Sequence, residues 1–240
     1  MLKNKILCVI PARGGSKEIP DKNIIHLNDK PLINWTIEAA INSKFISKII
    51  VSTDSNEIAK ISLLAGAEVP FIRPKELSTD GASSMSVIKH AVDFFSYQGE
   101  IYDLVVMLQP TSPLRNSDDI DKAIESYLKH RKGKEATLVS CCSVNSKYNW
   151  IMEKKDNRAV FVNNNLPVNL SRQELNLLFL PNGAIFIANT KNLQESFYTS
   201  DIIMYEMKES HSVDIDTLKD LQAAHDYIVK DKMDSSNGLY

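Results

Sequence analysis

Short apolar runs alternate with helical segments through the first 140 residues of the chain. The runs at residues 6–10 and 104–108 contain no charged residue, which is typical of strands buried on both faces of a parallel sheet. Between the runs, apolar residues recur at helical spacing. This βαβα order predicts an α/β fold, a mostly parallel sheet with helices on both faces.

The alternation predicts the positions of individual elements. We expect strands at residues 6–10, 48–52, 69–71, 104–108, 136–142, 183–188 and 202–205. Helices are expected at residues 31–41, 83–95 and near 190–197. Two more should begin at N-caps, one running from Asp54 to Gly66 and the other starting at Ser117. A last helix at the C-terminal end should place Leu218, Leu221, His225 and Ile228 on one face. Ligands bind at the carboxyl ends of strands in such sheets, so loops 11–23, 52–55 and 109–116 should meet.

Length and composition favour a single domain over residues 1–240. The chain is 43% hydrophobic with a net charge of −2, which gives no reason to expect a nucleic-acid or a membrane partner. Cys8, Cys141 and Cys142 lie in apolar runs without CxxC spacing, so we expect buried thiols and a cytoplasmic location. Residues 145–176 break the alternation, which indicates a functional or interface excursion.

The loop at residues 11–23 follows the first predicted strand and suits phosphate binding. Arg13, Lys17 and Lys22 surround Gly14-Gly15-Ser16, and cations of this kind balance phosphate charge while glycines allow close backbone approach. The stretch matches neither the Walker pattern nor Gly-x-Gly-x-x-Gly. An ordinary loop with solvated charges is the alternative.

Two further constellations suggest chemistry. Asp214 and Asp216 are two residues apart, so in extended backbone both carboxylates point to one side, which suits a hard divalent cation such as Mg²⁺. The alternative is that Asp216 caps the last helix and Asp214 is solvated. The proline-fixed loop at 109–115 presents Gln109, Thr111 and Ser112, which suit a base or a sugar, although a simple proline turn explains the loop as well.

Together these motifs resemble the bacterial acylneuraminate (sialic acid) cytidylyltransferases. The similarity runs from about residue 5 to residue 230, and the motifs follow one another in the same order as in that family. The matching stretches are residues 10–17 with Lys22-Asn23, 50–54, Arg73-Pro74 with 82–84, 108–115, 181–185 and 212–216.

The resemblance implies a Rossmann-like nucleotidyltransferase fold and a Mg²⁺-dependent reaction. The anomeric hydroxyl of a sialic-acid-like nine-carbon 2-keto sugar acid, N-acylneuraminate or N,N'-diacetyllegionaminate, would attack the α-phosphate of CTP and release pyrophosphate. It also implies a homodimer in which residues 145–176 reach the partner's active site. The alternatives are an enzyme for pseudaminate or an eight-carbon octulosonate, and a non-catalytic nucleotide-binding relative.

The resemblance also assigns roles to residues. The implied nucleotide-binding residues are Arg13, Gly14, Ser16, Lys22, Asn23, Arg73 and Ser84. The implied catalytic residues are Arg13, Lys22, Asp214 and Asp216, of which Asp214 and Asp216 hold the metal. The expected sugar-binding residues are Gln109, Thr111, Ser112 and Arg172.

Two positions depart from the family pattern. Leu180 stands where many sialic acid enzymes have arginine, so a bidentate donor for the sugar is missing and the preferred sugar is expected to be a relative such as legionaminic acid. Glu18 stands where glycine is common and adds negative charge beside a phosphate site. A salt bridge to Lys17 or Lys22 is the expected compensation.

Overall fold

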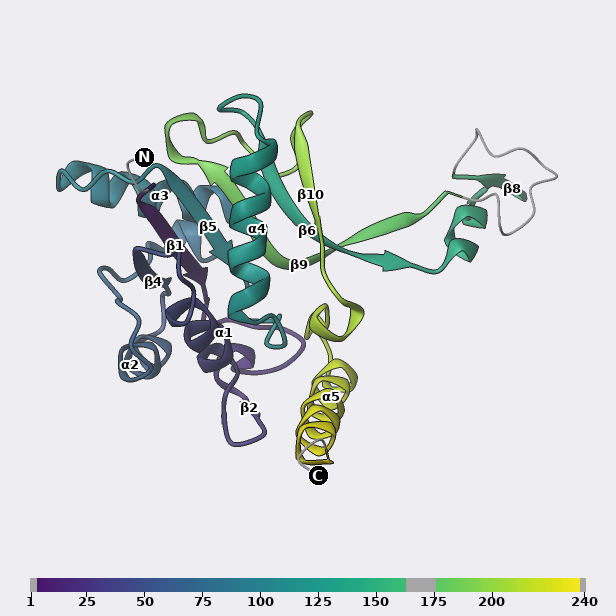
Figure 1. The fold of residues 1–240 in the computed structure, drawn as a ribbon, viewed down its shortest axis with the longest axis horizontal. Helices are drawn as coiled ribbons and strands as arrows, with labels where there is room; N and C mark the ends of the chain where they lie inside the picture. Colours follow the sequence, from purple (N-terminus) through teal and green to yellow (C-terminus); the bar gives the residue numbers. More distant parts are fainter. Residues whose placement is uncertain (1–3, 163–175, 238–240) are drawn as a thin grey trace.

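The computed structural model describes residues 4–162 and 176–237 and contains a six-stranded sheet (Figure 1). The strands follow the order β10-β6-β9-β5-β1-β4. They are β1 (Ile6–Pro11), β4 (Lys48–Ser52), β5 (Leu104–Leu108), β6 (Thr137–Val144), β9 (Leu178–Asn189) and β10 (Ile202–Glu206). β9 is antiparallel to β5 and β6, whereas the other neighbours are parallel. The predicted mostly parallel α/β sheet is confirmed.

The strands alternate between two cores because successive side chains point to opposite faces. Ile6, Cys8 and Ile10 of β1 pack toward helices α1 (Leu32–Ile41), α2 (Asn56–Leu64) and α4 (Ser117–His130). Leu7 and Val9 pack toward α3 (Ser84–Tyr97). Helices therefore cover both faces of the central strands, which explains their uninterrupted apolar sequences.

Two helix caps differ from the prediction by one residue. The N-cap of α2 is Ser55, whose Oγ accepts the Ile58 N–H, because the Asp54 carboxylate is bound to Gly14 instead. The N-cap of α4 is Asn116, which forms a capping box with Asp119.

Three other expected elements need correction. Residues 69–71 form no strand, and only isolated bridges at Glu68 and Ile72 join this segment to the sheet. Near residue 190 there is a 3₁₀ turn, η5 (Thr190–Asn192), because the Asn189 side chain accepts the Lys191 N–H and ends regular structure.

The last helix, α5 (Leu218–Asn237), presents a different face from the one expected. Leu221, Ala224 and Ile228 belong to the apolar cluster that holds it. Leu218 is 65% exposed and His225 is exposed, because the face that packs follows the spacing of Leu221, Ala224 and Ile228.

β6 and β9 continue beyond the sheet as a two-stranded ribbon (Figure 1). At its end lie a 3₁₀ turn, η3 (Ser146–Trp150), and the hairpin of β7 (Met152–Lys155) with β8 (Arg158–Phe161). We call residues 142–162 and 176–181 the arm. Its exposed large apolar side chains are Tyr148, Trp150, Ile151, Met152, Phe161, Val162, Leu177 and Leu180. Residues 163–175 of the expected excursion lie outside the described residues.

The cysteines are free in the structure. Cys8 and Cys141 are buried, as expected, whereas Cys142 is partly exposed because it lies on the arm, opposite Leu180. Among the described residues, no helix is long and apolar enough to cross a bilayer.

Candidate active site

The three loops that follow parallel strands β1, β4 and β5 meet at one edge of the sheet, as expected. Ala12 N donates to Ser52 O at 2.9 Å, and Arg73 N donates to Thr53 O at 2.7 Å. The loops at 11–23 and 109–116 border a cavity of about 330 Å³ together with residues 73–87, whereas the loop at 52–55 supports this wall without lining it. Its lining residues are Pro11, Arg13, Ser16, Lys22, Asn23, Arg73, Leu77, Thr79, Asp80, Ala82, Ser84, Val87, Gln109, Pro110 and Thr111.

This cavity brings together most of the residues expected to bind nucleotide or sugar. Eight of them line it: Arg13, Ser16, Lys22, Asn23, Arg73, Ser84, Gln109 and Thr111. Ser112 is fully buried beneath the loop and does not line the cavity. Arg172 lies outside the described residues.

Each cation of the first loop is paired with a carboxylate. Arg13 Nη1 lies 2.7 Å from Asp80 Oδ1, Lys17 pairs with the same carboxylate, and Lys22 Nζ lies 3.0 Å from Asp216 Oδ1. The hydrogen bonds from Lys17 and Arg13 hold the pKa of Asp80 below its usual range. Asp80 was not expected from the sequence, because no short motif marks it and its partners are more than 60 positions away.

The backbone of the first loop is fixed from two sides. Asn23 Nδ2 donates to Arg13 O at 2.9 Å, and Gly14 N donates to Asp54 Oδ1 at 2.9 Å. The Gly14 N–H, expected to point toward a phosphate, therefore has a carboxylate partner. A Cβ on Gly14 would lie 3.1 Å from Ser55 Cβ, so glycine allows the two loops to pass closely.

Arg73 is both buried and part of the cavity lining. Its Nε donates to Ser52 Oγ at 3.1 Å, and its Nη1 donates to Leu77 O at 3.4 Å. Burial lowers its pKa to about 10, so the guanidinium is still charged at neutral pH. The loop between β4 and α3 is thus tied to the sheet by a cation at the cavity wall.

Neither Asp214 nor Asp216 lines the cavity, although each lies next to a residue of its wall, and the surroundings of the two carboxylates differ. Asp216 is exposed and pairs with Lys22, whereas the Asp214 Oδ1 atom is buried without a hydrogen-bond partner. Burial raises the pKa of Asp214 above its usual value. An unsatisfied buried carboxylate oxygen beside a second carboxylate fits a site for a hard cation.

The capping alternative for Asp216 is wrong. Thr217 and Asp220 form the reciprocal cap of α5, because Thr217 N donates to Asp220 Oδ2 at 2.7 Å and Asp220 N donates to Thr217 Oγ1 at 3.4 Å. Among the described residues no cluster of three His, Cys, Asp or Glu side chains surrounds a metal position. A pair of carboxylates is compatible with Mg²⁺, because this ion keeps waters and phosphate oxygens in its shell.

Gly183 brings the sheet close to both Gln109 and Asp214. A Cβ on this residue would lie 3.0 Å from Gln109 Oε1 and 3.2 Å from Asp214 Oδ2, and its φ of +73° is in the left-handed region. A glycine is thus needed here for two reasons, space and backbone conformation.

The two departures from the family pattern have clear positions. Leu180 is 60% exposed on the arm and does not line the cavity. Glu18 is exposed, and the prediction that it pairs with Lys17 or Lys22 is wrong, because Lys17 pairs with Asp80 and Lys22 pairs with Asp216.

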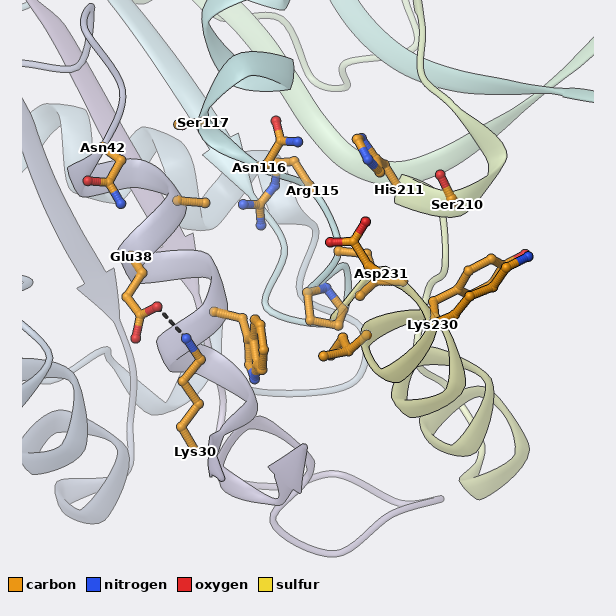
Figure 2. A pocket seen from close by; sticks show the side chains of 16 residues that line it. Lys30, Glu38, Asn42, Arg115, Asn116, Ser117, Ser210, His211, Lys230 and Asp231 are labelled. Atoms are coloured by element: carbon orange, nitrogen blue, oxygen red, sulfur yellow. Dashed lines mark hydrogen bonds and ion pairs between the residues drawn. The ribbon is translucent and has the colours of Figure 1, made fainter. Parts of the chain in front are cut away.

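A larger cavity of about 560 Å³ lies between α1, α5 and residues 113–117 (Figure 2). None of the residues expected in the active site lines it. Arg115 does line it, and no role was expected for this residue from its sequence. Its Nη2 donates to Thr36 Oγ1 at 2.8 Å and its Nε to Ala184 O at 3.3 Å, so this buried guanidinium fixes the loop that carries Gln109.

Comparison with known proteins gives a consistent family. A family model described as Cytidylyltransferase matches residues 7–236. Pseudaminic acid cytidylyltransferase of Campylobacter jejuni is 34% identical over 222 residues, which cover 92% of this chain and 94% of the relative. CMP-N,N'-diacetyllegionaminic acid synthase of Legionella pneumophila is 36% identical, with 89% and 91% covered. N-acylneuraminate cytidylyltransferase of Escherichia coli is 36% identical over 93% of this chain, which spans 52% of that relative's length.

Solved structures share the fold. A CMP:2-keto-3-deoxy-manno-octonic acid synthetase complexed with CTP superimposes with a TM-score of 0.71 at 17% identity, over 95% of this chain and 99% of the other. The sheet, the cavity at its carboxyl edge and the family match agree: the chain belongs to the cytidylyltransferase family and is a nucleotidyltransferase with a Rossmann-like fold.

Proposed function

We propose that the chain transfers CMP from CTP to the anomeric hydroxyl of a nine-carbon 2-keto sugar acid. The hydroxyl oxygen bonds to the α-phosphorus and its proton passes to water, while the bond between this phosphorus and the bridging oxygen breaks and pyrophosphate leaves with the electron pair. The observation that carries the proposal is the cavity that gathers Arg13, Lys22 and Arg73 beside two carboxylates, in a chain of this family.

The cations of the first loop would bind the triphosphate. Arg13, Lys17 and Lys22 exchange their carboxylate partners for phosphate oxygens, and Lys22 stabilises the charge on departing pyrophosphate. Arg73 and Ser84 hold the nucleoside side of CTP, since both line the cavity and Ser84 opens helix α3. No covalent enzyme intermediate is required.

Asp214 and Asp216 would hold Mg²⁺ together with phosphate oxygens and water. When bound, the ion supplies charge neutralisation at the transferring phosphate. Asp214 contributes its unpaired buried oxygen, and Asp216 becomes available when Lys22 turns to phosphate.

The sugar acid would lie against Gln109 and Thr111. The names of the three curated relatives support a nine-carbon acid, and they differ in which one: pseudaminic, N-acylneuraminic or diacetyllegionaminic acid. Leu180 favours a substrate other than N-acylneuraminate, because no guanidinium stands at that position to bind a carboxylate or acyl group. Arg172 stays a proposed sugar contact.

The activity is tested by pyrophosphate release with CTP, Mg²⁺ and purified sugar acids. The panel contains N-acylneuraminate, N,N'-diacetyllegionaminate, pseudaminate and the eight-carbon octulosonate. Lys22→Met should lower kcat by about 100-fold, the usual cost of removing one preorganised charge at a reacting centre. Lys60→Met on exposed α2 is the matched control and should keep wild-type activity. CTP binding without turnover of any sugar would reject the enzyme in favour of a non-catalytic relative.

The sugar preference is tested at position 180. Leu180→Arg should raise kcat/KM for N-acylneuraminate relative to the preferred sugar, because it restores the guanidinium. Leu180→Lys provides a charge without the bidentate fork and should give a smaller effect. Equal ratios in the wild type and both variants would remove position 180 from substrate selection.

We also propose that two copies of the chain associate through the arm. Its exposed apolar side chains, which include Trp150, Phe161 and Leu177, form a surface that isolated chains rarely leave in water. Light scattering should give the mass of a dimer, and Trp150→Glu with Phe161→Glu should give a monomer. A monomeric wild type would contradict the assignment of the arm.

A further inference from the structure

The two carboxylates lie in a segment with little regular structure of its own. Between β10 and α5 this segment, residues 207–217, contains only the 3₁₀ turn η6 (Glu209–His211). Asp214 follows the turn by three residues. Its position relative to the Gln109 loop therefore depends on contacts that the segment makes with the rest of the protein. We call residues 207–217 the carboxylate loop.

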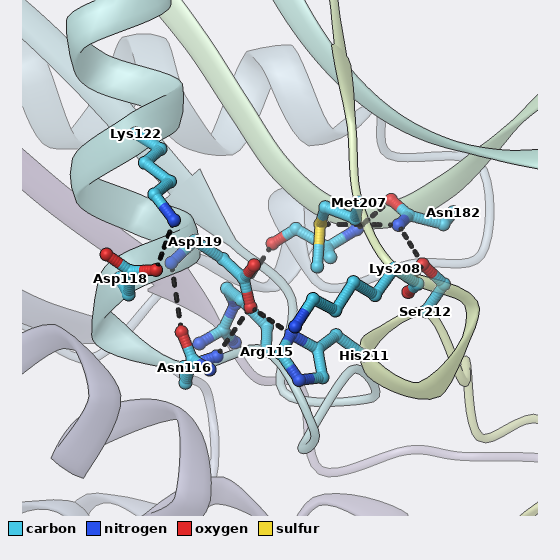
Figure 3. Close-up of polar contacts among 11 residues, drawn as sticks. Arg115, Asn116, Asp118, Asp119, Lys122, Asn182, Met207, Lys208, His211 and Ser212 are labelled. Carbon is cyan, nitrogen blue, oxygen red and sulfur yellow. Dashed lines mark hydrogen bonds and ion pairs between the residues drawn. The ribbon is translucent and has the colours of Figure 1, made fainter.

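One such contact joins the carboxylate loop to helix α4. His211 Nδ1 lies 2.8 Å from Asp119 Oδ2 (Figure 3), and the two residues are 92 positions apart. A carboxylate only accepts hydrogen bonds, so the hydrogen lies on Nδ1. Asp119 is 7% exposed, and its Oδ2 also accepts Asn116 N at 3.1 Å within the capping box. The imidazole is thus a second donor to an oxygen that the helix cap already fixes.

Two other contacts hold the same loop at neighbouring positions. Asn182 Nδ2 donates to Ser212 Oγ at 2.9 Å (Figure 3). Asn182 is itself fixed, because its Oδ1 accepts a hydrogen bond from Ser140 Oγ at 2.6 Å. Beyond Asp214, the Ile215 N–H donates to Thr111 O at 2.8 Å. The loop is therefore tied to the sheet, to α4 and to the sugar-side loop within five residues.

Helix α4 begins directly after the loop that contains Gln109 and Thr111. A tie from α4 to His211 therefore fixes the carboxylate loop against the element that continues the sugar-side loop. Neither Asp119 nor His211 lines the nucleotide cavity, so the tie has no direct contact with CTP.

We propose that His211 is a positioning residue for the metal site, acting through its hydrogen bond to Asp119. This inference rests on the proposed function, in which Asp214 and Asp216 hold the metal. Loss of the Nδ1–H donor should let the carboxylate loop move and should weaken metal binding in the CTP complex. Binding of CTP without metal should not change, because the first loop is held independently by Asn23 and Asp54.

The experiment compares three variants of the full chain. His211→Leu removes the donor at similar size, whereas His211→Asn places an amide nitrogen where Nδ1 stood and keeps a hydrogen bond to Asp119. His225→Leu is the matched control, since this imidazole is exposed on α5. Mn²⁺ binding to each CTP-saturated protein is measured from the free-ion signal in electron paramagnetic resonance. CTP binding in EDTA is measured by calorimetry.

We expect His211→Leu to bind Mn²⁺ about 10-fold or more weakly, as for other residues that orient metal ligands. His211→Asn should regain most of the loss, and CTP affinity in EDTA should stay at the wild-type level for all variants. A His211→Leu protein with wild-type Mn²⁺ affinity would overturn the proposal, and so would a His211→Asn protein as weak as His211→Leu. Should the leucine variant fail to fold, His211→Gln replaces it, because its amide lies beyond the position of Nδ1. A wild-type complex that binds no Mn²⁺ would contradict the metal site itself.

Discussion

Asp214→Asn should make the metal-free protein more stable at neutral pH while removing its activity. Burial raises the pKa of Asp214, because the ionised carboxylate has lost water and its Oδ1 has no partner. The folded state therefore binds this proton more tightly than the unfolded state. Ionisation of Asp214 therefore lowers the free energy of unfolding, and this loss of stability develops as the pH rises through the raised pKa. Below the unfolded-state pKa of about 4, where the carboxyl is protonated in both states, the loss is absent.

The magnitude follows from the cost of burying a polar atom without a hydrogen-bond partner, which is about 1–3 kcal/mol and larger for a charged group. The neutral asparagine variant should therefore gain about 1 to 2 kcal/mol near pH 8, where Asp214 is driven to ionise, and almost nothing near pH 4. A chain of this length would then melt roughly 2–8 °C higher at pH 8. Asp216→Asn is the control and should give no gain, because its carboxylate is exposed and pairs with Lys22.

Urea unfolding in EDTA at a fixed protein concentration, repeated from pH 4.5 to 8, measures this difference. Addition of Mg²⁺ and CTP should reverse the order of stability, since a ligand at 100 times its Kd stabilises the wild type by about 2.7 kcal/mol. A difference between wild type and Asp214→Asn that does not change with pH would refute the account of a desolvated carboxylate.

Three further changes test other parts of the site. Gly183→Ala should destabilise the protein by about 1–2 kcal/mol, through its left-handed backbone, and should reduce turnover by displacing Asp214; a fully active variant would contradict the close contact. Asp80→Asn should tighten CTP binding several-fold and steepen its salt dependence in calorimetry, because two cations lose their competing partner; unchanged affinity would mean that Asp80 does not compete. Maleimide should label Cys142 in the folded protein and Cys8 only after unfolding, since burial raises the pKa of Cys8 to about 12; mass spectrometry that finds Cys8 modified first would reverse this order.

The sequence predicted the elements whose pattern is local. Buried strands such as β1 and β5 have uninterrupted apolar residues, and the rule for carboxyl ends correctly placed three loops together. Helix caps were less certain because adjacent residues compete for the role. Asp54 was expected to cap α2, but it binds the Gly14 N–H, which lies 40 positions away and has no signal near Asp54 in the chain.

Side chains that act through distant partners could not be predicted. Asp80 and Arg115 carry the ion pairs and hydrogen bonds that shape the cavity, yet each is an ordinary charged residue in its local sequence. The difference in burial and hydrogen bonding between Asp214 and Asp216 could not be predicted for the same reason. Spacing places both carboxylates on one side, whereas burial, which depends on Gly183 and on the packing of the carboxylate loop, distinguishes them.

Strand β9 is divided between two environments, and the proposed role of Leu180 in sugar choice belongs to only one of them. Residues 184–188 are buried between β5 and β6, so substitutions at these positions would disturb the packing of the core and lower the stability of the fold. Residues 178–180 lie on the arm, and Leu180 is mostly in water. Surface substitutions away from special contacts usually cost less than about 0.5 kcal/mol. Libraries at Leu180, the position proposed to select the sugar acid, should therefore leave the folded core intact.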